Sequence, residues 1–405
     1  MTPSLVESLA LENTTRIVLL VLDGLGDLPN PERDWLTPLE AARTPNFDTL
    51  APRCALGRIL PVAPGITPGS GPGHLALFGY DPVETVVGRG VLEAIGAGFE
   101  LKPGDIAARA NFCTVDAAGV VTDRRAGRIP SEECARLVAR LQAVVPRIED
   151  VEILLRPGKG HRFVVVLRGP GLAGEVGDAD PHKEGKKIPP AEPLTAEAGA
   201  AKTARIVNLL VAQAASVLKA ERPANAVLMR GLSARPHFPG FRERFKLRAA
   251  ALAAYPMYRG VAQLAGMEVL PVGETPLDAF AAVGRVWNDH DFFFVHVKGT
   301  DQAGEDGNFD AKVATVEAVD QALPALLALK PDVLCVTGDH STPVPAKQHS
   351  WHPVPTLVHA PLCGADRLPR FHERHARAGS LGVLASKDLM AVLLANAGRL
   401  DKYGA

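Results

Sequence analysis

Acidic and imidazole side chains recur just after short apolar runs of this 405-residue chain. Asp23, Asp301 and the pair Asp339-His340 each follow such a run within four residues, and Glu305 stands four positions after Asp301. A spacing of four brings two side chains to one side of a helical turn. Carboxylate and imidazole groups are ligands for divalent ions such as Mn²⁺ or Zn²⁺. The pattern therefore indicates a metal site, although a solvated turn explains any one of these motifs taken alone.

One further motif, around Ser70, suits the handling of phosphate near such a site. Ser70 lies in the glycine- and proline-rich segment 67–74, where glycine lets the backbone approach a ligand closely and leaves the hydroxyl exposed. A helix beginning there would favour phosphate at its free amides. His349 and His352 follow the Asp339-His340 pair closely and add imidazole groups to the candidate metal ligands. The segment around Ser70 lacks the ending of a P-loop and the spacing of a nucleophile elbow, so neither class is indicated.

The apolar runs themselves predict the fold. Runs at 17–22, 226–229, 292–297 and 333–337 are typical of buried parallel strands, and helical patterns lie between them at 201–219 and 309–329. This alternation predicts an α/β fold with a mainly parallel sheet flanked by helices. Ligands bind outside the carboxyl ends of such strands. We therefore expect the three aspartates at one edge of the sheet.

The middle of the chain differs in texture, with shorter predicted strands, one helix and loops rich in glycine, proline and charge. We predict a smaller α/β domain at 103–190, inserted into a discontinuous catalytic domain of residues 1–102 and 191–405. The insert carries two basic runs, around Arg124 and around His161-Arg162. Arginine suits bidentate recognition of phosphate and carboxylate, although an ordinary charged surface also explains either run.

Composition narrows the classes of partner. Lys+Arg 44 against Asp+Glu 45 gives a formal net charge of −1, which argues against broad binding of nucleic acid or anionic membranes. No apolar stretch approaches the ~20 residues that span a bilayer, and no signal-peptide pattern opens the chain. The 5 cysteines are scattered, as in reduced cytoplasmic proteins. We expect a cytoplasmic protein that binds a phosphorylated ligand at one local site and not over a broad basic surface. The sequence predicts no particular oligomeric state.

Taken in order, the motifs resemble those of the alkaline phosphatase superfamily. The matching residues are Asp23-Gly24, Thr44-Pro45-Asn46, Ser70 among glycines, Asp301, Asp339-His340 and His349. Within it, the chain is similar nearly end to end to the cofactor-independent (2,3-bisphosphoglycerate-independent) phosphoglycerate mutases of the archaeal-type branch. That similarity runs through Gly79-Tyr80-Asp81-Pro82, Arg109-Ala110-Asn111-Phe112, the segment 123–128 and Tyr258-Arg259-Gly260.

The resemblance implies an alkaline phosphatase-like core with two divalent ions, Mn²⁺ being the first candidate and Mg²⁺, Co²⁺ or Zn²⁺ the alternatives. The ligands of one ion would be Asp23, Asp339, His340 and the Ser70 hydroxyl. Those of the other would be Asp301, Glu305 and His349. In many relatives the position of Glu305 holds histidine, so His352 is a second candidate for the missing imidazole. A carboxylate there is a harder ligand and adds negative charge.

The resemblance also implies the activity, which is interconversion of 3-phosphoglycerate and 2-phosphoglycerate through a phosphoserine on Ser70, in glycolysis and gluconeogenesis. The candidates for holding this small phosphorylated substrate are Arg124, His161, Arg162 and Lys298. The inserted domain would close over the site and exclude water. A metal-dependent phosphatase or another phosphomutase remains the alternative enzyme. A metal-binding structural or sensor protein is the alternative outside catalysis.

Overall fold

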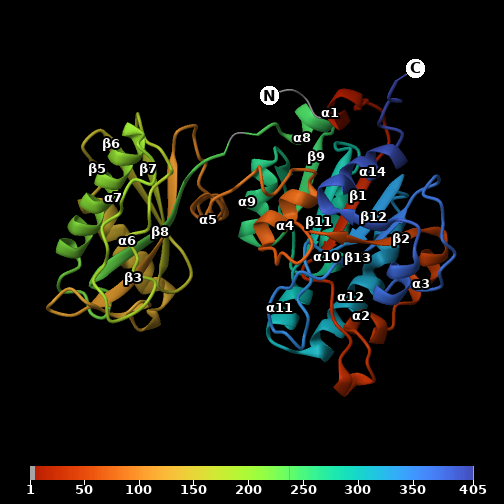
Figure 1. Cartoon of the computed structure of the whole chain (residues 1–405), viewed down its shortest axis with the longest axis horizontal. Helices are drawn as coiled ribbons and strands as arrows, with labels where there is room; N and C mark the ends of the chain where they lie inside the picture. The colour runs from red at the N-terminus through yellow and green to blue at the C-terminus, as the bar shows by residue number, and fades with distance from the viewer. Residues whose placement is uncertain (1–4, 237, 405) are drawn as a thin grey trace. The chain divides into compact units, whose positions relative to one another are not determined.

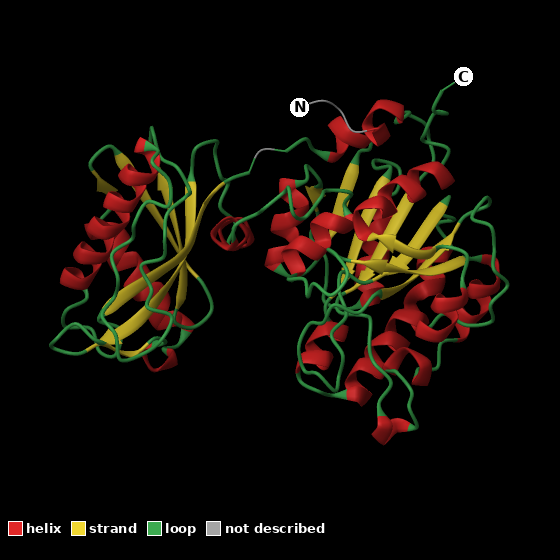
Figure 2. Ribbon diagram, viewed as in Figure 1, coloured by secondary structure: helices red, strands yellow, loops and turns green. Residues whose placement is uncertain are grey.

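The computed structural model describes residues 5–236 and 238–404, and the chain divides into two compact units. The first unit comprises Met1–Val86 and Phe238–Ala405, and the second comprises Val87–His237. Each unit contains its own sheet and its own helices (Figures 1 and 2). Among the helices of the described residues, none combines the length and the apolar character needed to cross a membrane.

The first unit is built on an eight-stranded sheet with the order β10-β9-β11-β1-β12-β13-β2-β14. Most neighbouring strands are parallel, and β13 is the exception because it pairs antiparallel with both β12 and β2. The predicted mainly parallel α/β fold is thus confirmed. The strands are β1 (Ile17–Leu22), β2 (Ala55–Leu60), β9 (Ala249–Leu252), β10 (Glu268–Val269), β11 (Phe292–Val297), β12 (Val333–Thr337), β13 (Val354–His359) and β14 (Gly382–Ala385).

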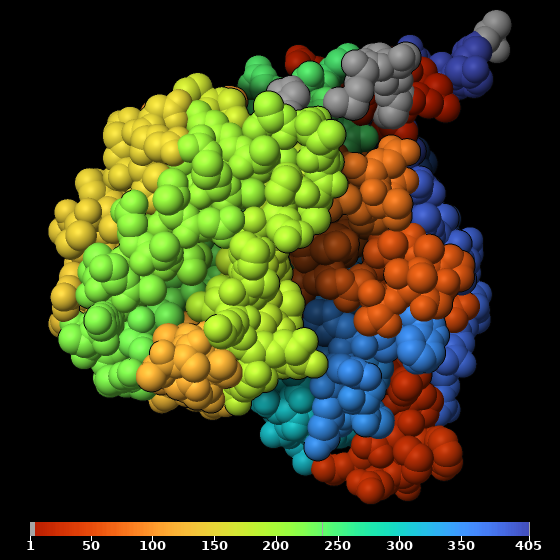
Figure 3. All heavy atoms as spheres, turned by 60° about the vertical axis from the view of Figure 1, so that its left-hand side comes forward, coloured from red at the N-terminus to blue at the C-terminus, as the bar shows by residue number. Residues whose placement is uncertain are grey.

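Helices lie on both faces of this sheet, which is why β1 and β12 are buried along their whole length (Figure 2). The loop that carries the 3₁₀ turn η1 (Pro31–Arg33) protrudes from the unit (Figure 3). Trp35, which follows this turn, is exposed. The α-helices are α1 (Leu5–Leu9), α2 (Pro38–Ala41), α3 (Pro45–Leu50), α4 (Ser70–Leu77), α8 (Phe241–Phe245), α9 (Pro256–Leu264), α10 (Pro276–Arg285), α11 (Gly299–Glu305), α12 (Phe309–Leu327), α13 (Glu373–Ala378) and α14 (Leu389–Asn396). The 3₁₀ turns are η1 (Pro31–Arg33), η2 (Ala51–Arg53) and η4 (Ser386–Asp388).

The second unit has a six-stranded antiparallel sheet, in which β3 pairs with β4, β7 and β8. Two long helices, α6 and α7, pack their apolar sides against one face of it. The strands are β3 (Ile106–Val115), β4 (Val121–Asp123), β5 (Arg147–Ile148), β6 (Val151–Pro157), β7 (Arg162–Arg168) and β8 (Ala226–Ala234). The helical segments are α5 (Arg89–Gly96), η3 (Ala126–Arg128), α6 (Ser131–Val144) and α7 (Ala198–Val217).

One predicted element belongs elsewhere. The run 226–229 was expected in the parallel sheet, but β8 pairs antiparallel with β3, and α7 covers the same second sheet. A four-residue apolar run carries no information about its pairing partner, so the periodicity was insufficient here. The second unit, Val87–His237, extends further along the sequence in both directions than the expected domain 103–190. At the start of this unit, α5 packs closely against β3. A Cβ on Gly90 of α5 would meet the carbonyl oxygen of Ala107 in β3 at 2.3 Å.

Candidate metal centre and arginine face

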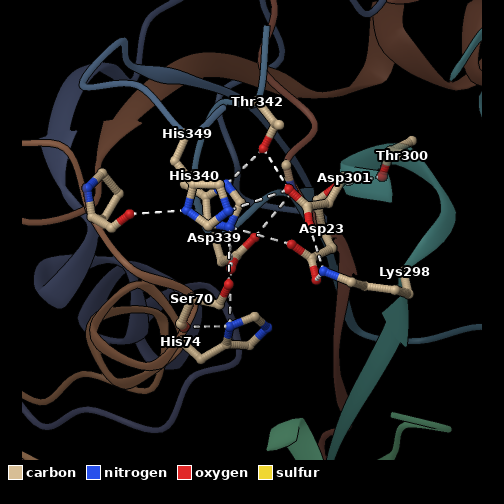
Figure 4. A network of polar contacts seen from close by, with 12 residues as sticks. Asp23, Ser70, His74, Lys298, Thr300, Asp301, Asp339, His340, Thr342 and His349 are labelled. Carbon is tan, nitrogen blue, oxygen red and sulfur yellow. Dashed lines mark hydrogen bonds and ion pairs between the residues drawn. The ribbon is translucent and has the colours of Figure 1, made fainter. Parts of the chain in front are cut away.

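The carboxyl ends of three neighbouring strands carry the acidic residues of the site. Asp23 directly follows β1, Asp339 follows β12 after one glycine, and Asp301 lies in the first turn of α11, just after β11. These strands are in parallel register, so their ends meet at one edge of the sheet, as expected. Ser70 begins α4 and points into the same group (Figure 4).

The first group of candidate ligands is Asp23, Asp339 and His340, whose ligand atoms all lie within 4.8 Å of one another. His340 Nε2 is 3.4 Å from Asp23 Oδ1 and 3.2 Å from Asp339 Oδ2. Ser70 Oγ lies 3.2 Å from the same nitrogen. The three ligand residues are fully buried. All four residues predicted for one ion are therefore together.

The second group is Asp301, His340 and His349, again with ligand atoms within 4.8 Å of one another. His349 Nε2 is 3.5 Å from Asp301 Oδ1, and the rings of His340 and His349 stack with centroids 3.6 Å apart. His340 belongs to both groups, so the two groups are contiguous. The spacing of the sequence motifs did not reveal this sharing.

Glu305 and His352, the two alternatives for completing the second group, differ in position. Glu305 Oε1 is 3.8 Å from His349 Nε2, and its side chain is 54% exposed at the end of α11. His352 Nδ1 instead contacts Ser350 Oγ at 3.0 Å, and its ring stacks on Trp351. Neither residue belongs to the two groups of ligand atoms, but Glu305 is adjacent to one of their members.

Hydrogen bonds orient His340 for coordination. Thr342 Oγ1 donates its single proton to Asp301 Oδ1 at 2.6 Å, so its 3.0 Å contact with His340 Nδ1 is one in which the imidazole donates. That assignment leaves a lone pair on Nε2, the nitrogen facing Asp23, Asp339 and Ser70. Burial lowers the pKa of His340, which favours the neutral ring that a ligand must have.

The donor set fits divalent cations. Asp23 Oδ1 and Asp339 Oδ2 are buried and accept no hydrogen bond, although His74 Nδ1 lies 3.1 Å from the latter. His74 Nδ1 donates instead to the Ser70 carbonyl at 2.8 Å. A buried carboxylate oxygen without a partner is costly, and a bound cation would satisfy it.

Lys298 partly balances the carboxylates. Its ammonium donates to Asp23 Oδ2 and to Tyr258 Oη, each at 3.0 Å, and it also contacts Asp301 Oδ2. Burial alone would lower the pKa of Lys298, but the two carboxylates raise it above its ordinary value. Burial likewise works to raise the pKa of Asp23, yet His296, Lys298 and His340 hold it well below the ordinary value. Lys298 thus lies within the candidate metal centre.

The second unit carries a separate set of cationic side chains. Along β3 the apolar residues Ala108 and Ala110 face the core under α6 and α7, so Arg109 and Asn111 face the opposite side. Register places Arg230 of β8 opposite Arg109, and Arg162 of β7 opposite Asn111. Directly paired residues share a face. We call these four residues the arginine face.

Several polar atoms of the arginine face have no partner. Arg109 Nη1 donates to Glu93 at 3.0 Å, but Arg109 Nε, Arg230 Nε and Asn111 Oδ1 are buried without hydrogen bonds. Burial, together with the charges of neighbouring arginines such as Arg230, lowers the pKa of Arg109 to about 10. The two unpaired guanidinium N–H groups suit an anionic ligand.

The substrate residues predicted in the insert have different surroundings. His161 is buried, and burial together with the charges of Arg162 and Arg109 lowers its pKa to about 4, so the ring is neutral. Arg124 instead makes a bidentate pair with buried Asp180, its Nη2 lying 2.6 Å from Oδ2. Sequence reasoning did not select Arg109 or Arg230 for binding. The sequence signal available for Arg109 was a charged residue inside a largely apolar run, and for Arg230 it was a charged residue directly after the apolar run 226–229.

Known proteins share this sequence and fold. The family described as 2,3-bisphosphoglycerate-independent phosphoglycerate mutase matches residues 51–225. A Thermotoga neapolitana protein named probable 2,3-bisphosphoglycerate-independent phosphoglycerate mutase is 53% identical over 400 residues, covering 99% of this chain and 98% of its own. A Thermus thermophilus protein of the same name is 53% identical over 402 residues, covering 98% of each. The chain belongs to this family.

Solved structures agree with the assignment to this mutase family. A cofactor-independent phosphoglycerate mutase from Thermoplasma acidophilum is 31% identical with a TM-score of 0.77, and the match covers 95% of this chain and 100% of that one. A Pyrococcus horikoshii protein gives a TM-score of 0.82 at 31% identity, covering 97% and 100%. The predicted family and its isomerase class are therefore confirmed.

Lys312 ties the loops of the metal centre together and provides a test. Its buried ammonium donates to Gly24 O at 2.8 Å, to Thr342 O at 2.9 Å and to Asp27 Oδ2 at 2.7 Å. We expect Lys312→Ala to lower the free energy of unfolding by about 3–5 kcal/mol, because it leaves a buried carboxylate uncompensated. It should also weaken Mn²⁺ binding, measured by titration calorimetry. Lys402→Ala, at an exposed site, is the control; equal stability of both variants would contradict this role.

Proposed function

We propose that this chain is a phosphoglycerate mutase that interconverts 3-phosphoglycerate and 2-phosphoglycerate without 2,3-bisphosphoglycerate. The observation that carries the proposal is the position of Ser70, whose Oγ lies 3.2 Å from the shared ligand His340. Membership of the mutase family and 53% identity to relatives so named support it. Such an activity would belong to glycolysis and gluconeogenesis and to the cytoplasm.

Two divalent ions would occupy the two contiguous groups, with Mn²⁺ the first candidate and Mg²⁺, Co²⁺ or Zn²⁺ the alternatives. Asp23, Asp339, His340 and the Ser70 hydroxyl would hold one ion. Asp301, His349 and Glu305 would hold the other, and we favour Glu305 over His352 because only Glu305 lies beside His349. Bound there, such ions supply Lewis acidity, which lowers the pKa of a serine hydroxyl and offsets phosphoryl charge.

The chemistry of the chain's own residues then follows in two transfers. Ser70 Oγ attacks phosphorus, and the bond between phosphorus and the 3-oxygen of the substrate breaks. The 3-oxygen takes up the proton lost by the serine. Phosphoserine and glycerate result. After glycerate reorients, its 2-hydroxyl oxygen attacks the same phosphorus and the bond between phosphorus and Ser70 Oγ breaks. The proton lost by the 2-hydroxyl passes to Ser70 Oγ, which restores the serine. Because Ser70 opens α4, the phosphoryl group would lie at free amides of a helix N-terminus.

Substrate recognition needs further cations. Lys298 is the candidate contact for phosphate at the metal centre, since its ammonium lies beside Asp23 and Asp301. On the second unit, the arginine face with His161 offers donors for carboxylate and phosphate. Arg124 is already paired with Asp180 and is the weaker candidate. The exclusion of water by this unit stays a prediction.

The direct test is formation of 2-phosphoglycerate. Purified protein is incubated with Mn²⁺ and 3-phosphoglycerate, with no 2,3-bisphosphoglycerate, and the product is detected by coupling to enolase. We expect 2-phosphoglycerate to form with little inorganic phosphate. Release of phosphate alone would identify a phosphatase. Turnover of neither kind, with metal still bound, would favour a structural or sensor protein.

Ser70→Ala tests the covalent step. We expect kcat to fall by at least about a thousandfold, because the nucleophile is removed, while at least one ion stays bound. Acid-quenched wild-type enzyme should carry phosphate on the peptide containing Ser70, detected by mass spectrometry. Ser216→Ala, on the exposed side of α7, is the matched control. Unchanged activity of Ser70→Ala would contradict the phosphoserine route.

Arg230→Gln tests the arginine face. Loss of a charged donor to the substrate should raise KM about tenfold or more, with the bound-metal content unchanged. Steady-state kinetics and metal analysis measure the two effects. Arg140→Gln removes the same charge from an exposed position of α6, and α6 covers the face of the sheet opposite the arginine face. This control variant should leave KM unchanged. Equal KM values in both variants would exclude Arg230 from substrate binding.

A further inference from the structure

A cavity of about 760 Å³ opens at the end of the first unit's sheet that lies opposite the metal centre. It adjoins the start of β12 and the end of β13, whereas Asp339 and His349 lie at the other ends of these strands. The residues that surround it and carry the argument are Arg53, Lys330, Asp332, His359, Cys363 and Arg367.

The cavity holds an excess of positive charge. Across residues 5–236 and 238–404, Arg53, Lys330 and Arg367 form no ion pair with any carboxylate. The single acidic side chain in the lining, Asp332, is engaged elsewhere, because its Oδ2 accepts a hydrogen bond from the Arg16 amide at 2.7 Å. Three cations therefore face a space whose lining holds one carboxylate, and this excess of positive charge is a binding opportunity for an anion.

His359 adds an unsatisfied polar group to the same wall. It is the last residue of β13, and its Nδ1 is buried without a hydrogen-bond partner. Burial lowers the pKa of His359, and the charge of Arg53 lowers it further, so the ring is neutral. A buried polar atom without a partner calls for an explanation such as a bound ligand or ion.

The walls are held in place by interactions of their own. The Asp366 carboxylate accepts hydrogen bonds from the amides of Leu56, at 2.7 Å, and Ser380, at 3.0 Å. These bonds fix the loop that carries Arg367, whose φ of 60° is left-handed, as is that of Lys330 at 54°. Non-glycine residues in this region are uncommon. A site fixed before binding loses less entropy when its ligand arrives.

We propose that this cavity is a second anion site, which binds a metabolite-sized molecule with two or more phosphate or carboxylate groups. Three cations match a multiply charged ligand, and the volume lies within the usual range of small-molecule pockets, about 300–1,000 Å³. The site is separate from Ser70 and the ligand groups, so the proposal does not rest on the mutase activity.

Calorimetric titration of the full-length protein, as purified, tests the proposal with inorganic pyrophosphate and citrate as probes. The double variant Arg53→Gln/Arg367→Gln should lose one binding event present in the wild type, or show that event at least about tenfold more weakly, because two charged hydrogen-bond donors are removed. Loss for pyrophosphate alone indicates a phosphate ligand, and loss for both probes indicates any polyanion.

Two matched variants make the result decisive. Arg242→Gln/Arg285→Gln removes the same charge from exposed positions of α8 and α10 and should bind both probes like the wild type. Lys330→Gln, also exposed, should weaken the same event and replaces the double variant if that protein does not fold. Mutase activity should not change. Identical isotherms for the cavity and control variants, or for Lys330→Gln and wild type, would overturn the proposal.

Discussion

The structure depends on holding three carboxylates of one charge, Asp23, Asp301 and Asp339, in a buried cluster. Like charges repel strongly where water is excluded, so the cluster needs positive charge beside it. Lys298 supplies part of that charge by contacting two of the three. The unpartnered oxygens of Asp23 and Asp339 show that the ammonium alone does not satisfy the cluster. We propose that divalent ions complete the balance, and such ions would let a chain of net charge −1 bind a phosphorylated substrate.

The fold serves this cluster by bringing several loops to one point. A Cβ on Gly73 would meet the Asp339 carbonyl oxygen at 2.6 Å, so only glycine lets α4 pack against the loop after β12. That close approach puts Ser70 next to His340. Lys312 joins the loops after β1 and β12, because its ammonium donates to a backbone carbonyl group of each loop. Ser70 and the candidate ligands are thus positioned by backbone packing as well as by contacts of their own side chains.

The sequence predicted the parts of the site that follow from strand ends. The rule that ligands bind at the carboxyl edge of a parallel sheet located Asp23, Asp301 and the Asp339-His340 pair. The sharing of His340 depends on the turn after β12, which no spacing reveals. The prediction that β8 belongs to the parallel sheet was wrong, because a short apolar run does not specify which strand it pairs with. Arg109 and Arg230 were missed because their common face exists only once β3 and β8 are in register.

The most direct test of the account is the number of metal ions bound per chain. The protein is dialysed against excess Mn²⁺, passed through a desalting column and analysed for metal by mass spectrometry. We expect two ions per chain for the wild type and one for His349→Ala, because His349 belongs to one group of candidate ligands only. One ion in the wild type, or the same content in both proteins, would contradict two contiguous sites.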